Sequence, residues 1–157
     1  MASVRHALEA DVPAMVELGR RMHAESPTYR ELSYSPEKAA ALGLRVVGTL
    51  LNPGGALVAE VDGTIVGMLA GYVVEHWFSH DKVASDYVLY IDPEHRGGMT
   101  AVRLIRAFER WAIAQGATVL LPGVSTGVKT EQTRDLYRAL GYEPYGVAMM
   151  KRCGDGL

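Results

Sequence analysis

The sequence predicts a single α/β domain that covers residues 1–157, with the element order β-α-α-β-β-β-α-β-α-β-β. Two observations predict this class. The chain has 157 residues and a hydrophobic content of 48%, which suffices for one buried core. Apolar residues recur at steps of three and four in some segments, as in helices, and form β-branched runs in others, as in strands. Helices and strands therefore share one folding unit.

The first third of the chain predicts one short strand and two helices. Residues Ser3–Ala7 form a short apolar start. At Asp11-Val-Pro13 an aspartate that can accept amide hydrogen bonds precedes a proline that the first helical turn tolerates, so a helix begins there and ends near Pro27. Ser35-Pro36 repeats the start signal, and the second helix runs towards a stop at 52–55.

Three strands are predicted in the middle of the chain. Leu57–Val61 and Thr64–Val74 flank Asp62-Gly63, a dipeptide typical of a tight hairpin, so these two strands are antiparallel. The third strand, Val83–Ile91, ends before Pro93, which cannot donate a hydrogen bond to a sheet.

The last third predicts two helices and the remaining strands. A strongly amphipathic helix covers Thr100–Gln115 and ends at Gly116, and a short strand follows at Thr118–Leu121. A second helix covers Thr130–Leu140. The segment Tyr142–Met150 is predicted as one bent strand or two.

Charge and composition exclude several classes of function. Sixteen basic and 18 acidic residues leave no dense basic face, so we expect no nucleic-acid partner. The one cysteine, Cys153, cannot form a disulfide or a cysteine-based zinc site within the chain, and the five histidines form no helical pair, so no metal site is expected. Apolar runs are too short for a membrane span and no signal peptide is apparent, so a cytoplasmic protein is expected.

One strand–loop–helix segment carries the main functional signal. Between the strand ending at Ile91 and the helix starting at Thr100, a loop with Gly97 and Gly98 directs backbone N–H groups and the positive helix end towards one point, which suits a phosphate group. By themselves the two glycines are also explained by a simple backbone turn. Neither a P-loop nor a G-x-G-x-x-G motif is present.

This segment resembles the acyl-CoA-binding motif of the GCN5-related N-acetyltransferase (GNAT) superfamily. That motif is a strand ending in Val-x-Pro, followed by Arg/Gln-x-x-Gly-x-Gly/Ala at the start of a helix. Ile91-Asp92-Pro93 and Arg96-Gly97-Gly98-Met99-Thr100-Ala101 are in register with it. The departure is Met99, where the family usually has glycine.

A second block, Thr130–Tyr142, resembles the family's Asn-x-x-Ala-x-x-Leu-Tyr-x-x-x-Gly-Phe helix. Four residues keep the pattern: Leu136, Tyr137, Gly141 and Tyr142. Thr130 replaces the usual asparagine and Thr133 the usual alanine. The two blocks lie at the separation customary in the family.

The resemblance implies a mixed, mainly antiparallel central sheet flanked by about four helices. It also implies transfer of an acetyl group from acetyl-CoA to a primary amine, in a small molecule or a peptide, by direct attack. Leu89, Tyr90 and Ile91 would hold the pantetheine arm, and Arg96 with residues 97–101 (Gly97, Gly98, Met99, Thr100 and Ala101) would hold the pyrophosphate. Tyr137 would be the general acid that protonates the CoA thiolate, because a phenol stays protonated at neutral pH.

The general base and the acceptor are left open. Glu75, His76 and Asp86 are candidates for the base, and each is equally explained as a solvated strand-end or turn residue. By resemblance, acceptor specificity comes from His23–Ser35 and Pro144–Val147. The first segment contains Glu25, Tyr29, Glu31 and Tyr34, which suit a cationic amine or simply a solvated loop.

Two further alternatives concern activity and assembly. Met99 and Thr130 also fit a catalytically silent acyl-CoA-binding or protein-interaction module on the same fold. The apolar segments Val119–Leu121 and Ala148–Met150 are predicted strands, and the resemblance implies that the final strands often lie at a dimer contact. A homodimer is therefore expected, in which the twofold contact covers the strand edge. The alternative is that Met149 and Met150 fill the core of the protomer itself.

Overall fold

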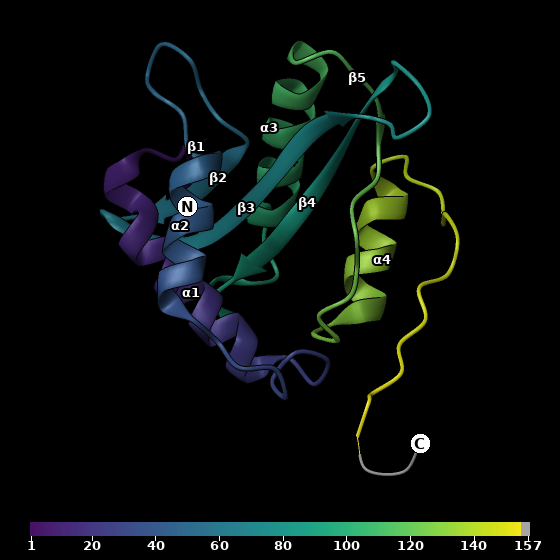
Figure 1. Cartoon of the computed structure of the whole chain (residues 1–157). Helices are drawn as coiled ribbons and strands as arrows, with labels where there is room; N and C mark the ends of the chain where they lie inside the picture. The colour runs from purple at the N-terminus through teal and green to yellow at the C-terminus, as the bar shows by residue number, and fades with distance from the viewer. Residues whose placement is uncertain (155–157) are drawn as a thin grey trace.

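This computed structural model describes residues 1–154. The centre of the fold is a five-stranded mixed sheet (Figure 1). The strands follow the spatial order β1-β2-β3-β4-β5, and the first four are antiparallel to their neighbours, whereas β5 runs parallel to β4. Their bounds are β1 Ser3–His6, β2 Ala56–Val61, β3 Thr64–Glu75, β4 Lys82–Ile91 and β5 Ala117–Leu120.

Four α-helices cover the two faces of the sheet. They are α1 Val12–Glu25, α2 Pro36–Val46, α3 Thr100–Ala114 and α4 Thr130–Ala139. Helices α1 and α2 lie on one face, α3 lies on the other, and α4 lies beside β5 (Figure 1). Two short 3₁₀ turns, Glu9–Asp11 and Pro93–His95, precede α1 and follow β4.

Each face of the sheet has its own hydrophobic core because side chains alternate along a strand. On the α3 face, Leu57 and Leu69 pack with Leu104 and Phe108. On the α1 face, Val58, Met68 and Tyr90 pack with Leu18. The amphipathic pattern that predicts α3 is therefore used as expected, with its apolar residues buried against the sheet.

The structure confirms the predicted α/β class and the order of the first nine strands and helices. The second helix is shorter than predicted, since it ends at Val46. The reason lies at Gly48, where a Cβ atom would be 2.2 Å from the carbonyl oxygen of Asn52 and 2.2 Å from the amide of Gly54. The chain folds back on itself there, which a continuing helix cannot do.

The prediction of one or two strands at Tyr142–Met150 is wrong, because residues 142–154 form neither helix nor strand. Tyr142 is anchored, since its hydroxyl donates a hydrogen bond to Glu109 (2.9 Å). Beyond it, Pro144 has no amide to donate, and Gly146 has a φ of 68°, so the backbone does not stay extended.

Two irregularities of β4 open the sheet. Tyr87 is bulged, because Val88 pairs with Ala70 while Asp86 pairs with Gly71. On the other side, the pairing of β4 with β5 stops at Ala84. Strands β4 and β5 then separate, and the last seven residues of β4 have no strand beside them on that edge.

Candidate active site

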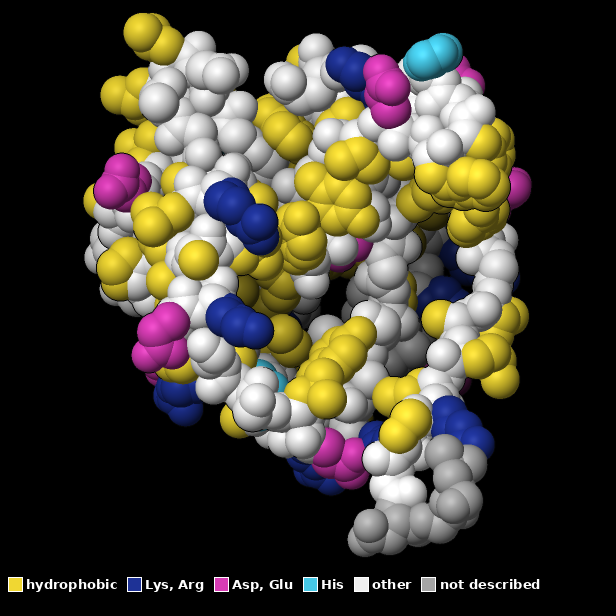
Figure 2. All heavy atoms as spheres, viewed as in Figure 1, with side chains coloured by type: hydrophobic (Ala, Val, Ile, Leu, Met, Phe, Trp, Pro, Cys, Tyr) yellow, Lys and Arg dark blue, Asp and Glu magenta, His cyan; other side chains and the backbone are white. Residues whose placement is uncertain are grey.

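The gap between β4 and β5 leads into a cavity with a volume of about 770 Å³, here called the main cavity. It is seen as a hollow between the helices α1 and α2 and the part that carries α4 (Figure 2). The lining comprises residues 86–91, 93, 95–98, 100, 101, 123–126, 128, 129, 132, 133 and 136, together with Met22 and Tyr29.

One end of the main cavity is formed by the glycine loop and the start of α3. The positive φ of 87° belongs to Gly97, and a Cβ atom there or at Gly98 would meet no other atom within 4 Å. The first amides of a helix have no acceptor within it. Outside α3, no amide of residues 97–101 donates to another residue in the described range. These amides are therefore available to an anion.

Met99 does not distort this loop. Its φ is −83°, an ordinary value, so the residue that needs glycine is Gly97 and not its neighbour. The Met99 side chain is 57% exposed and does not line the main cavity. The family's usual glycine is therefore not required at this position for the backbone conformation seen here.

Arg96 lines the main cavity, but its guanidinium is already engaged. It makes two hydrogen bonds to the Glu25 carboxylate (2.6 and 2.7 Å), and its Nε donates to the Ile91 carbonyl (2.7 Å). Tyr90 donates to the same carboxylate at 3.0 Å and lies under the guanidinium, 5.2 Å from its ring centroid. The expected phosphate contact of Arg96 thus competes with a bidentate ion pair.

This network ties the end of α1 to the end of β4. The Arg96 hydrogen bonds lower the pKa of Glu25, and the Tyr90 hydroxyl adds to the effect. Burial, followed by the Glu25 carboxylate, raises the pKa of Tyr90 to about 12. Glu25 is therefore ionised and Tyr90 protonated at neutral pH, which keeps the network intact and holds the glycine loop in place.

The open edge of β4 offers backbone groups along the floor of the main cavity. The Asp92 amide donates to the Val66 carbonyl (2.8 Å), and in an antiparallel pair hydrogen-bonded residues alternate. Leu89 and Ile91 consequently direct their backbone N–H and C=O groups away from β3 and towards the cavity. The Ile91 carbonyl is taken by Arg96, so the other groups remain for a ligand.

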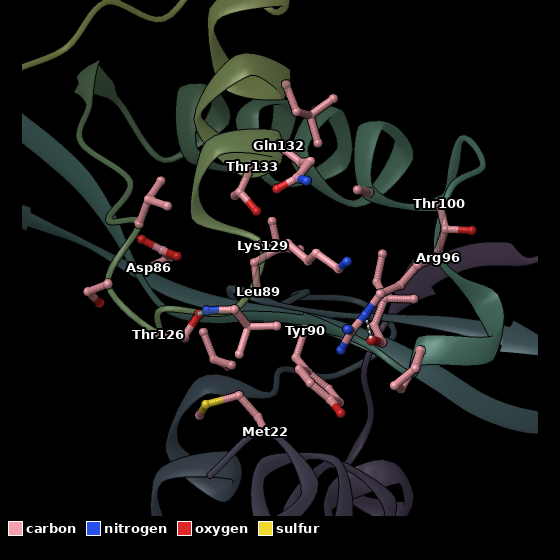
Figure 3. Close-up of a pocket in the computed structure, with 18 of the residues that line it drawn as sticks. Met22, Asp86, Leu89, Tyr90, Arg96, Thr100, Thr126, Lys129, Gln132 and Thr133 are labelled. Carbon is pink, nitrogen blue, oxygen red and sulfur yellow. Dashed lines mark hydrogen bonds between the residues drawn. The ribbon is translucent and has the colours of Figure 1, made fainter. Parts of the chain in front are cut away.

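Asp86 lies at the opposite end of the main cavity, next to the bulge (Figure 3). Its carboxylate accepts a hydrogen bond from the Gly123 amide (2.8 Å). Burial raises the pKa of Asp86, although the hydrogen bond from Gly123 works in the opposite direction. The sequence names Asp86 as one of three candidate bases, and it is the one that lines this cavity. Glu75 is the last residue of β3 and His76 follows it, and neither lines the cavity.

Tyr137 lies behind the cavity wall formed by α4. It is 5% exposed, packs edge-on against Tyr142 with ring centroids 5.0 Å apart, and borders a smaller hollow that shares Val124 with the main cavity. Burial, and after it the negative charge of Asp86, raise the pKa of Tyr137. Its hydroxyl is therefore protonated throughout the physiological range and is electrostatically coupled to Asp86.

The residues expected to recognise a cationic acceptor are paired within the chain. Glu25 binds Arg96, Glu31 binds Arg152, and the Tyr34 hydroxyl donates to the Val16 carbonyl (2.7 Å). Tyr29 differs in that it lines the main cavity, where its hydroxyl donates to Ser125 (2.8 Å). The loop after α1 therefore meets the loop before α4 and closes one side of the cavity.

Sequence reasoning missed the residues that α4 brings to the site. Lys129, Gln132 and Thr133 line the main cavity (Figure 3). The signal for Thr133 was present, because it occupies the alanine position of the second block. Lys129 lies just before that block and no motif includes it.

Between residues 1 and 154, no three His, Cys, Asp or Glu side chains gather as a metal ion would need. In the same range, no helix has the length and apolar character that crossing a membrane requires.

The sequence matches the acetyltransferase (GNAT) family over residues 18–142. No curated protein matches the sequence significantly. Solved structures with a similar fold include the aminoglycoside N-acetyltransferase AAC(6')-Iy in complex with CoA, with a TM-score of 0.74 at 16% identity over 97% of this chain and 94% of that one.

Two other solved structures share the fold. A ribosomal-protein-alanine N-acetyltransferase from Brucella melitensis biovar Abortus 2308 has a TM-score of 0.73 at 19% identity, with 98% of this chain and 100% of that one covered. A glucosamine-6-phosphate N-acetyltransferase from Arabidopsis thaliana has a TM-score of 0.70 at 14% identity, with 98% and 99% covered.

Proposed function

The chain belongs to the acetyltransferase (GNAT) family, and on that premise we propose that it transfers the acetyl group of acetyl-CoA to a primary amine. One observation carries this proposal. The main cavity joins, in one continuous space, a cluster of free backbone amides, an unpaired strand edge and a half-buried carboxylate. These are the groups that a diphosphate, an extended pantetheine arm and an amine nucleophile require.

The residues present fit acetyl-CoA. The amides of Gly97 to Ala101 and the positive end of α3 suit the diphosphate, and Arg96 supports this loop through Glu25. The free backbone groups of Leu89 and Ile91, with Tyr90 between them, suit the amide-containing pantetheine arm, which would extend β4 in the manner of an added strand. The thioester then lies near the β4 bulge.

In the proposed reaction, the amine nitrogen attacks the thioester carbonyl carbon, so that a C–N bond forms and the C–S bond breaks. Asp86 takes the proton that leaves the nitrogen, and Tyr137 gives a proton to the departing thiolate. After the reaction Asp86 holds one extra proton and Tyr137 lacks one, so exchange of protons with water restores both groups before the next turnover. One proton thus passes from nitrogen to sulfur in each turnover.

The acceptor class follows from the same family. Similar folds belong to enzymes named for an aminoglycoside, a ribosomal protein and glucosamine 6-phosphate, all of which carry primary amines. We propose a primary amine of a small molecule or a peptide as the acceptor. Calorimetry with acetyl-CoA tests the cofactor, and release of free thiol with a panel of small amines and peptide N-termini tests catalysis.

The outcomes separate an enzyme from a silent module. Saturable binding of acetyl-CoA with amine-dependent thiol release is the expected result. Absence of binding at millimolar acetyl-CoA would overturn the proposal. Binding without thiol release for any amine would instead favour a catalytically silent acyl-CoA-binding or protein-interaction module on the same fold.

Tyr137→Phe tests the proton donor. We expect kcat to fall by roughly 10- to 1,000-fold, with little change in acetyl-CoA affinity, because the hydroxyl acts when the thiolate leaves. Single-turnover measurements separate the rate of the chemical step from the rates of binding and product release. An unchanged single-turnover rate would remove Tyr137 from the mechanism and would leave its ring as a packing partner of Tyr142.

We also propose that the chain forms a homodimer through the β5 edge and the segment that follows Tyr142. In the described residues β5 pairs with β4 alone, and Tyr145, Val147, Met149 and Met150 are largely exposed, with Met149 at 89%. The methionines do not fill the core of the protomer. Light scattering at micromolar concentration should give about twice 17.0 kDa, reduced by Met149→Lys; a mass near 17.0 kDa across dilution would exclude the dimer.

Location is part of the same proposal. We propose that the protein is cytoplasmic. Its single cysteine, Cys153, is an exposed free thiol, which suits a reducing compartment.

A further inference from the structure

The Lys129 side chain enters the main cavity from the start of α4. It extends towards the end of the cavity that holds Arg96 and Thr100, away from Asp86 (Figure 3). Within residues 1–154, its ammonium group has no carboxylate within ion-pair distance and makes no hydrogen bond. Lys129 is an exposed residue at the rim of the cavity, and a lysine there without an ion-pair partner can offer its charge to a ligand.

Lys129 differs from the other charged residues of the cavity in its ion pairing. The charged lining residues are Asp86, Arg96 and Lys129. Arg96 is neutralised by Glu25 through two short hydrogen bonds, and Asp86 lies at the opposite end. Among the cavity-lining residues in the described range 1–154, Lys129 is therefore the cation without an ion pair, although its charge also contributes to the lowered pKa of Glu25. Its ammonium group can balance a negative ligand near the amides of the glycine loop.

The backbone at Lys129 supports the same interpretation. Its φ and ψ are 50° and 42°, the left-handed conformation that costs a residue with a Cβ atom about 1–2 kcal/mol. Glycine or asparagine would adopt this conformation with less strain. A strained backbone conformation persists only where the surrounding structure enforces it. At Lys129 this conformation directs a long cationic side chain into the cavity.

We propose that Lys129 is the cationic partner of the diphosphate of acetyl-CoA, acting opposite the amides of the glycine loop. This inference rests on the proposed function and assigns the charge role to Lys129 instead of Arg96. Arg96 is then a positioning residue, which holds the glycine loop and the end of β4 through Glu25 and Ile91. The diphosphate is thus held between two structural elements, α3 and α4.

The test uses Lys129→Asn, because asparagine tolerates the left-handed conformation, favours the start of a helix and has no charge. Kd is measured by calorimetry for CoA, for dephospho-CoA, which lacks the 3′-phosphate, and for pantetheine, which lacks all phosphates. Lys38→Gln, an exposed lysine of α2, is the matched control for loss of one positive charge.

Lys129→Asn should weaken the binding of CoA and dephospho-CoA by roughly 10- to 100-fold, the range for a charged hydrogen bond, and should leave pantetheine within about twofold. Its melting temperature should not fall. Lys129→Arg should retain most of the affinity, and Lys38→Gln should bind all three ligands as the wild type does.

Three results would overturn the inference. They are unchanged CoA binding by Lys129→Asn, equal weakening of pantetheine, and a loss of affinity for CoA that dephospho-CoA does not show, which would move the contact to the 3′-phosphate. If wild-type protein binds CoA while Lys129→Asn is normal, the proposed function stands and this inference alone fails. If the wild type binds no CoA, both fail.

Discussion

Gly97 is the position where a single added methyl group should disturb the glycine loop that we propose holds the diphosphate. Its φ is 87°, and a Cβ atom at this site would meet nothing within 4 Å, so steric contact with other residues does not contribute. In Gly97→Ala the whole cost is therefore the left-handed backbone strain, about 1–2 kcal/mol for a residue with a Cβ atom.

This strain can lower either the free energy of unfolding or the free energy of acetyl-CoA binding. The two losses should together equal the strain energy. If the loop keeps its conformation, the free energy of unfolding falls by about 1–2 kcal/mol and acetyl-CoA affinity is unchanged. If the loop relaxes in the free protein, stability is retained and binding must restore the strained conformation, which raises Kd by roughly 5- to 30-fold. Because the loop is exposed and Arg96 anchors only its start, we expect most of the cost in Kd.

The assay combines urea denaturation with calorimetry of acetyl-CoA on the same preparations. Gly63→Ala is the matched control, since Gly63 has a similar φ of 78°, equally open space, and a place in the β2–β3 turn away from the main cavity. It should lose stability by a similar amount and bind acetyl-CoA normally. If Gly97→Ala changes neither quantity, the loop does not need its left-handed residue and the reasoning is refuted.

Three further predictions concern charge and packing. Asp86→Asn should be inactive in single-turnover assays and at least as stable as the wild type at pH 7. The pKa of Asp86 is raised in the folded protein, so the stability that this group contributes declines as pH rises through the folded pKa. A loss of stability at pH 7 would contradict this prediction. Glu25→Gln should lose about 1–2 kcal/mol near neutral pH, measured by denaturation. The lowered pKa of Glu25 stabilises the fold above the ordinary carboxylate range and is lost as pH falls through the folded value, so wild type and variant should converge in acid. Gly71→Ala should cost about 1–3 kcal/mol, since a Cβ atom there would lie 2.4 Å from the Ser85 carbonyl oxygen and 2.6 Å from Phe108; an unchanged urea midpoint would show that the core yields.

Much of the site could be predicted because its signals are local. The strand ending at Ile91, the loop with its left-handed Gly97 and the helix from Thr100 are consecutive in the chain, so hydrophobic period, proline and glycine positions define them together. The same holds for the helix that carries Tyr137. Where the residues that determine a structural element lie within about fifteen positions of one another, the sequence pattern alone predicts that element.

The final segment shows where local signals fail. Alternating apolar residues after Tyr142 predict a strand, yet a strand forms only when a neighbouring edge accepts its backbone hydrogen bonds. In residues 142–154 of this structure the backbone has no such partner. The β5 edge and this segment are the pair that an interface with a second copy would bring together.

The chemistry of the cavity was decided by contacts between residues far apart in the sequence. The sequence alone determined the α/β class, the family and the loop that would hold a phosphate. Only the tertiary structure brought Glu25 onto Arg96, 71 positions away, and the Gly123 amide onto Asp86, 37 positions away. These contacts neutralise Arg96, leave Lys129 as the cation that we propose for the diphosphate, and raise the pKa of the half-buried Asp86 through burial. Pairing of distant charges depends on how the elements pack, which no local pattern of residues records.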